Sequence, residues 1–127
     1  MNGPDLTPVG PDAYRSALRQ LHAEAAEALR PLESAWSTAD PETIAVTAEF
    51  TCLLLGQVGH DLAALAAPPE DLVEHVRLLD RMCASSAAAY SALARAARGD
   101  RAASEEFRTL GQHSIICVAA LQELEPL

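Results

Sequence analysis

The pattern of apolar and polar positions is clearest between residues 44 and 65. Apolar or small side chains recur there at alternating steps of three and four residues, which is the spacing of one buried helix face. They are Ile44, Ala48, Thr51, Leu55, Val58, Leu62 and Leu65. Polar residues, among them Glu49, Gln57 and Asp61, fall on the opposite side. The pattern predicts an amphipathic helix with one buried stripe.

Similar stripes predict three more helices. The first begins at Pro11-Asp12 and ends near Trp36, and the proline inside it, Pro31, predicts a kink or a restart near residues 28–30. The third begins at Glu70-Asp71, and the fourth spans about residues 102–123. The inner stripe of the first helix is Tyr14, Ala17, Leu18, Leu21, Ala25, Ala28 and Leu32. That of the third is Leu72, Val76, Leu79, Cys83, Ser86, Tyr90, Leu93 and Ala97. That of the fourth is Phe107, Leu110, Ser114, Val118 and Leu121.

The breaks between these segments carry residues typical of helix ends. Asp40-Pro41-Glu42 combines an N-cap residue with a proline and an acid for the first turn. Pro68-Pro69 ends the second helix, and Gly99 is suited to a left-handed cap on the third. Helices joined by such short loops run antiparallel to their neighbours. We therefore predict an all-α, antiparallel up-down-up-down four-helix bundle over residues 11–127, preceded by a flexible arm over residues 1–10.

Charge and cysteine content narrow the choice of partners and compartment. The 127 residues carry a formal net charge of −9, and such a surface repels nucleic acids and anionic membranes, so neither is an expected partner. The first twelve residues lack the basic and apolar regions of a signal peptide. The three cysteines form no CxxC pair. Together these features predict a cytoplasmic protein with free thiols.

Small residues flank the inner stripes of the second and third helices. In the second helix they are Ala45, Gly56, Gly59 and Ala63, and in the third they occupy residues 85–89. Small flanks either let neighbouring helices pack closely or leave an apolar surface for a second copy of the chain. The expected partner is therefore a second copy, giving a homodimer, or another protein.

The three cysteines are candidates for a metal site. If each helix folds back antiparallel to the one before it, one layer of the bundle contains Cys52, Cys83 and Cys117. His113 lies one turn before Cys117. Three thiolates and an imidazole suit Zn²⁺ or Cu⁺. The alternative is that the cysteines are packed as small apolar side chains.

Two histidines have their own interpretations. Gly59-His60-Asp61-Leu62 resembles the site of histidine phosphotransfer domains, where an exposed histidine sits in the middle of a helix of a four-helix bundle. The Lys-Gly that usually follows such a histidine is Ala63-Ala64 here. The resemblance implies phosphotransfer through His60, and the alternative is an ordinary surface histidine. His75 comes four residues after Asp71 and is expected to lie nearly level with Asp61 of the second helix, so a surface ion pair is expected for it.

No catalytic motif stands out in the sequence. A GxSxG elbow, a Walker loop, a Rossmann fingerprint, HExxH and the Glu-x-x-His of di-iron bundles are all absent. The leading hypothesis is therefore a non-enzymatic interaction or regulatory module that associates with itself. The alternatives are a metal- or thiol-binding bundle, phosphotransfer through His60, and a carrier of a small apolar molecule. The last would use an alanine-rich core packed loosely near Trp36 and Tyr90 or Phe107.

Overall fold

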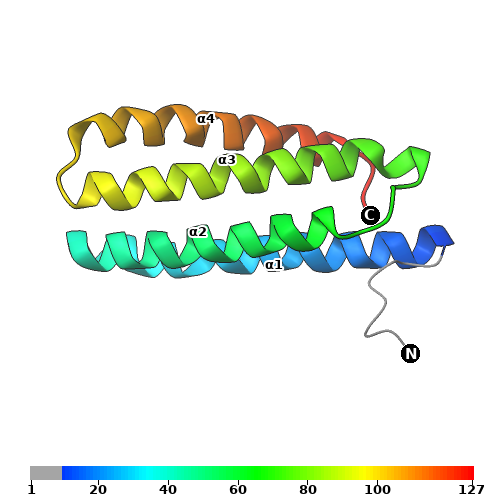
Figure 1. Ribbon diagram of the computed structural model, residues 1–127, viewed down its shortest axis with the longest axis horizontal. Coiled ribbons are helices and arrows are strands. Elements are labelled where there is room, and N and C mark those ends of the chain that lie inside the picture. The colour runs from blue at the N-terminus through cyan, green and yellow to red at the C-terminus, as the bar shows by residue number, and fades with distance from the viewer. Residues whose placement is uncertain (1–9) are drawn as a thin grey trace.

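A computed structural model describes residues 10–127, which form four helices and one short 3₁₀ turn. The helices are α1 (Gly10–Thr38), α2 (Pro41–Ala63), α3 (Val73–Ala97) and α4 (Arg101–Glu123), and the turn η1 (Glu70–Leu72) precedes α3. The helices run alternately up and down, with α1 and α2 in one layer and α3 and α4 in the other (Figure 1). The predicted all-α antiparallel four-helix bundle is confirmed. The predicted arm lies outside the described residues except for Gly10, which begins α1.

The predicted helix ends have the expected capping geometry. The Asp40 carboxylate accepts a hydrogen bond from the backbone N–H of Thr43 at 3.1 Å, so it caps α2, which begins at Pro41. At the end of α3, Gly99 adopts φ +105°. The Asp100 N–H donates to the Arg95 carbonyl and the Gly99 N–H to the Ala96 carbonyl, each at 3.0 Å. This pair of bonds is a Schellman motif, which requires the left-handed conformation that Gly99 supplies.

The proline inside α1 does not divide the helix. α1 continues through Pro31 to Thr38, so the restart near residues 28–30 does not occur. Leu32 and Ala35, which follow the proline, are both buried and anchor the last turns of the helix against the bundle. Burial of the segment on both sides of the proline offsets the backbone hydrogen bond that the proline removes.

The burial observed in the core agrees with the sequence pattern in α1 and α2 and differs from it in α3 and α4. The predicted stripes of α1 and α2 are buried almost throughout, and Leu18 and Leu55 are fully buried. α3 is buried over a wider arc than predicted because it packs against both α2 and α4. In α4 only Ala103 and Leu121 are buried, since α4 packs mainly against α3. The side of the bundle between α1 and α4 is therefore left open.

Candidate functional site

The outward side of α2 is apolar although it faces away from the core. We call Val46, Phe50 and Leu53 the α2 outer face; these side chains are 54%, 54% and 72% exposed. They recur at steps of four and three residues, so they lie along one side of the helix. The buried residues of α2 lie on the opposite side: Ala45, Ala48, Thr51, Leu55, Val58 and Leu62. α2 is therefore apolar on two opposite sides and buried on only one.

The predicted flanking residues are only part of this surface. Of the small residues expected to leave an apolar surface, Gly56 and Ala63 are exposed on α2, whereas Ala45 is fully buried. The larger residues Val46, Phe50 and Leu53 were missed by the sequence reasoning. They could have been found in the sequence by looking for the same helical spacing on the side of α2 opposite the predicted stripe.

The open side between α1 and α4 contains two cavities, which we call the α1–α4 seam. The larger cavity, about 690 Å³, lies toward the end where the chain finishes and is lined by α1, α3, α4 and residues 124–127. The smaller, about 470 Å³, lies farther along the same side and is lined by α1, α3 and α4. Ala26 on α1 lines the larger cavity, and Leu29, one turn later, lines the smaller. The two cavities thus follow each other along one side of the bundle.

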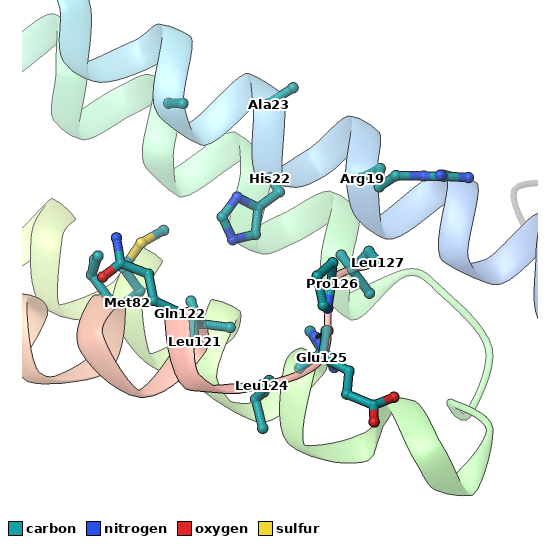
Figure 2. Close-up of a pocket in the computed structure, with 13 residues that line it drawn as sticks. Arg19, His22, Ala23, Met82, Leu121, Gln122, Leu124, Glu125, Pro126 and Leu127 are labelled. Atoms are coloured by element: carbon teal, nitrogen blue, oxygen red, sulfur yellow. Dashed lines mark hydrogen bonds between the residues drawn. The ribbon is translucent and has the colours of Figure 1, made fainter.

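The larger cavity has polar side chains on α1, at its edge. The His22 ring on α1 points across the cavity toward Leu121 and Gln122 of α4 (Figure 2). Arg19, one turn earlier on α1, lies at the edge of the cavity, and its side chain runs along α1. The Glu125 carboxylate points away from both of these residues. The cavity therefore combines an apolar floor with a basic edge on α1.

His75 lies in the wall of the same cavity, so the prediction that it forms a surface ion pair with Asp71 or Asp61 is wrong. Its side chain is 9% exposed, and its Nε2 lies 2.9 Å from the backbone carbonyl oxygen of Glu125. Because a carbonyl only accepts, Nε2 must carry the proton and donate it to this bond. Asp71 pairs with Arg15 of α1 instead. The contact fixes residues 124–127 against α3, and Leu124 and Leu127 pack against the main core.

The smaller cavity lies where loose packing was expected. Trp36, Tyr90 and Phe107 all line it, together with Leu32 and Leu93. The centroids of the Tyr90 and Phe107 rings lie 6.3 Å apart, within the range of interacting aromatic pairs, and the ring planes are tilted by 44°. Burial raises the pKa of the Tyr90 hydroxyl above its usual value of 10.0. Trp36 is 55% exposed, so much of its side chain is in water.

The residues of the predicted metal site lie in different surroundings. Cys83 is buried in the main core, where burial and then the charge of Asp80 raise its pKa to about 11. Cys117 and His113 line one surface cavity between α3 and α4, and Cys52 is half-buried on α2. Between residues 10 and 127 there is no group of three or more His, Cys, Asp or Glu side chains placed to hold a metal ion. The zinc or copper site stays a prediction.

His60 is exposed on α2, as the resemblance to phosphotransfer domains requires, but it lies in the last turn of the helix rather than in its middle. Its neighbour Asp61 accepts a hydrogen bond from the Gln57 side chain at 2.9 Å. No other observation bears on phosphate transfer, so a phosphotransfer role for His60 stays a prediction.

Comparison with known protein families, with curated proteins and with solved structures finds no match for this chain. The four helices that the structure describes lack the combination of length and apolar character needed to cross a membrane. The fold and the geometry of the two surfaces are therefore the basis for a functional proposal.

Proposed function

We propose that this chain is a non-enzymatic interaction module that associates with a second copy of itself through the α2 outer face. The observation that carries the proposal is that α2 is apolar on two opposite sides while only one of them is buried. A helix that is apolar all round is usually covered all round. Large exposed apolar side chains gathered in one place mark interaction sites in soluble proteins.

The charges around the α2 outer face favour a second copy of this acidic chain. Residues 50–59 contain no charged side chain, although the whole chain carries a net charge of −9. Glu49 borders this segment, and its carboxylate is paired with the Arg98 guanidinium at 2.8 Å. Two copies that meet along α2 therefore bring few unpaired like charges together, and the rest of their acidic surfaces stays apart.

The shape of the α2 outer face suits a two-fold pairing. In an antiparallel pair of α2 helices centred on Leu53, Phe50 of one copy lies at the level of Gly56 of the partner subunit, because both positions are three residues from the centre. Gly56 is exposed, and a Cβ added there would meet nothing in its own chain within 4 Å. The missing side chain leaves room for the phenyl ring, so the face is complementary to itself.

Light scattering over a range of protein concentrations tests the proposal. We expect a dimer for the wild-type chain and a monomer for Phe50→Asp, since a carboxylate at the centre of an apolar contact must be desolvated. Ile116→Asp is the matched control: Ile116 is 65% exposed, but it lies on α4 and should leave the dimer intact. Raising the salt concentration should strengthen the dimer by screening the acidic surfaces. A wild-type chain that stays monomeric at high concentration would overturn the proposal.

A second variant separates association from folding. Gly56→Leu replaces a glycine in a helix interior, so the free energy of unfolding of the monomer should rise by about 0.5–1 kcal/mol. The same side chain fills the space that the Phe50 ring of the partner subunit needs, so dimerisation should weaken. A variant that is more stable as a monomer and less associated cannot be explained by misfolding. Unchanged association in Gly56→Leu would contradict the pairing centred on Leu53.

A further inference from the structure

The α1–α4 seam has the dimensions of a site for one elongated apolar molecule. It extends along α1 from Arg19 to Ser37, which is about 27 Å at the rise of an α-helix. The larger cavity alone, about 690 Å³, is within the range of small-molecule sites. None of the residues of the α2 outer face lines either cavity, so this site is independent of the proposed dimer contact.

The walls of the seam are apolar over most of its length. Met82, Val118 and Leu121 line the larger cavity, and Leu29, Leu32 and Phe107 line the smaller. No described charged side chain other than Glu33 lines the smaller cavity, whereas Arg19 and Glu125 line the larger. A ligand that fits both cavities therefore needs a long apolar body and a polar group at one end only.

The charges at the edge of the larger cavity indicate the sign of that polar group. Within residues 10–127, Arg19 takes part in no ion pair, although six other arginines do. His22 on the next turn points into the cavity, and the one acid that lines it, Glu125, turns its carboxylate away (Figure 2). A guanidinium and an imidazole N–H are both hydrogen-bond donors, and a carboxylate accepts from both.

We propose that the α1–α4 seam binds one long-chain carboxylate, with its head group at Arg19 and His22 and its alkyl chain extending along the seam toward Trp36. The long, flexible Arg19 side chain reaches the head group by folding over the edge of the cavity. The alkyl chain covers Met82 and Leu121 first, and its far end enters the cavity lined by Tyr90, Phe107 and Trp36.

Trp36 fluorescence can report on this binding mode, because Trp36 is the single tryptophan of the chain and lines the smaller cavity. Titration with octadecanoate, whose extended chain is nearly as long as the seam, should shift the Trp36 emission to shorter wavelength as the alkyl chain displaces water from the ring, whereas the shorter dodecanoate should bind without reaching Trp36. A series from octanoate to dodecanoate should bind about threefold to fourfold more tightly for each added methylene. Absence of any spectral shift and of any heat of binding would overturn the proposal.

Variants at the two parts of the site test the head group and the alkyl chain separately. Arg19→Gln should weaken dodecanoate binding about tenfold and leave dodecanol binding unchanged, because the alcohol has no charge. Arg101→Gln is the matched control, since Arg101 also forms no ion pair among the described residues and lines neither cavity. Equal effects of Arg19→Gln on the acid and the alcohol would overturn the assignment of the head group.

Ala26→Phe tests whether the seam itself is the site. Ala26 is exposed on α1 and lines the larger cavity, so a phenyl ring there should fill the seam without disturbing the core. We expect this variant to lose binding of both dodecanoate and dodecanol, with an unchanged unfolding temperature and an unchanged oligomeric state. Retained binding would place the ligand elsewhere and overturn the proposal. A changed oligomeric state would mean that a helix of another copy occupies the seam, which also overturns it.

Discussion

The Thr51 hydroxyl on α2 donates a hydrogen bond to the backbone carbonyl oxygen of Ala28 on α1, at 3.2 Å and fully buried. Ala28 lies three residues before Pro31, in the turn of α1 where the proline ring crowds the preceding carbonyl groups and removes one N–H donor. Backbone carbonyls that are buried need a partner. The N–H that Pro31 lacks would bond the Glu27 carbonyl, so the Thr51 hydroxyl adds a donor at the carbonyl next to the one that the proline leaves without a helical partner.

Thr51→Val should lower the free energy of unfolding by about 1 kcal/mol, because it removes a buried hydrogen bond while keeping the branched shape of the side chain. For a domain of this size that corresponds to a fall in unfolding temperature of about 4 °C. Thermal unfolding followed by circular dichroism measures it. Thr47→Val, at a half-buried position one turn earlier on α2, is the control and should change stability by less than about 0.5 kcal/mol.

The link between Thr51 and the proline can be tested in the background of a second variant. In Pro31→Ala the backbone N–H of residue 31 is restored to the Glu27 carbonyl, and the ring that crowds the preceding carbonyls is removed, so the Ala28 carbonyl can accept from the Leu32 N–H without hindrance. Thr51→Val should then cost less than it does in the wild-type chain, giving a measurable coupling between the two sites. Equal costs in the two backgrounds would show that Thr51 acts independently of Pro31.

Helical periodicity was sufficient to predict the fold, because an apolar stripe marks each helix and residues typical of helix ends mark each break. Asp40 and Gly99 are the clearest cases, since their roles depend on contacts a few residues away in the sequence. The burial of His75 could not be predicted in this way. Its partner is the carbonyl of Glu125, fifty residues later, and only the packing of residues 124–127 against α3 brings the two together.

The candidate surfaces were less predictable than the fold. Leu53 and its neighbours on α2 follow helical spacing, but a search for one buried stripe on each helix does not look for a second apolar stripe on the exposed side. The α1–α4 seam depends on how closely helices that are distant in the sequence approach each other. Its far end was anticipated from the large side chains of Trp36, Tyr90 and Phe107, whereas the larger cavity beside His22 was not.

The three thiols should differ strongly in reactivity toward a maleimide. Cys52 and Cys117 are half-buried and should react in the folded chain, whereas Cys83 is buried. Burial also raises the pKa of Cys83 from 9.0 to about 11, so very little of the reactive thiolate forms near neutral pH. Peptide mapping by mass spectrometry at pH 7.5 should find Cys83 unlabelled until denaturant is added. Labelling of Cys83 at the rate of the other two would contradict its burial.

The same experiment examines the predicted metal site. A site built from Cys52, Cys83, Cys117 and His113 should make all three thiols resist labelling when Zn²⁺ is present, because a bound thiolate is no longer a free nucleophile. If Zn²⁺ leaves the labelling of Cys52 and Cys117 unchanged, the cysteines are packing residues. His113→Ala serves as the matched variant, since it removes a ligand without changing any thiol.

Acid should weaken the contact between the end of α3 and α2. The Arg98 guanidinium lies 2.8 Å from Glu49 and 3.1 Å from Glu42, and its hydrogen bond lowers the pKa of Glu49 below 4.5. A carboxyl group whose pKa is lowered by folding stabilises the folded state above its unfolded pKa. That contribution is lost as pH falls through the lower, folded pKa. Stability should therefore decline as pH drops below about 4.5.

Arg98→Gln should make this acid-induced decline shallower, because Glu49 then titrates alike in the folded and unfolded chains. Urea unfolding at several pH values between 3 and 7 measures the difference. Arg108→Gln is the control, since the pair of Arg108 with Glu105 lies within α4 and joins no two helices. If the two variants follow the same pH dependence, the contact of Arg98 with α2 is not responsible.

Two residues with positive φ should respond to substitution in opposite directions. Ala39, between α1 and α2, adopts φ +53°, a left-handed conformation that costs a residue with a Cβ about 1–2 kcal/mol. Ala39→Gly removes this cost but adds backbone freedom to the unfolded chain, so the free energy of unfolding should rise by about 0.5–1 kcal/mol.

Gly99→Ala is the reciprocal variant, at φ +105° in the cap of α3, where an added Cβ would meet nothing within 4 Å. Because there is no clash, its expected loss of about 1–2 kcal/mol comes from the backbone conformation alone. Chemical denaturation of both variants at pH 7 measures the two effects. If Ala39→Gly destabilises the chain, the left-handed conformation at residue 39 is not a source of strain, and the turn between α1 and α2 depends on the alanine side chain itself.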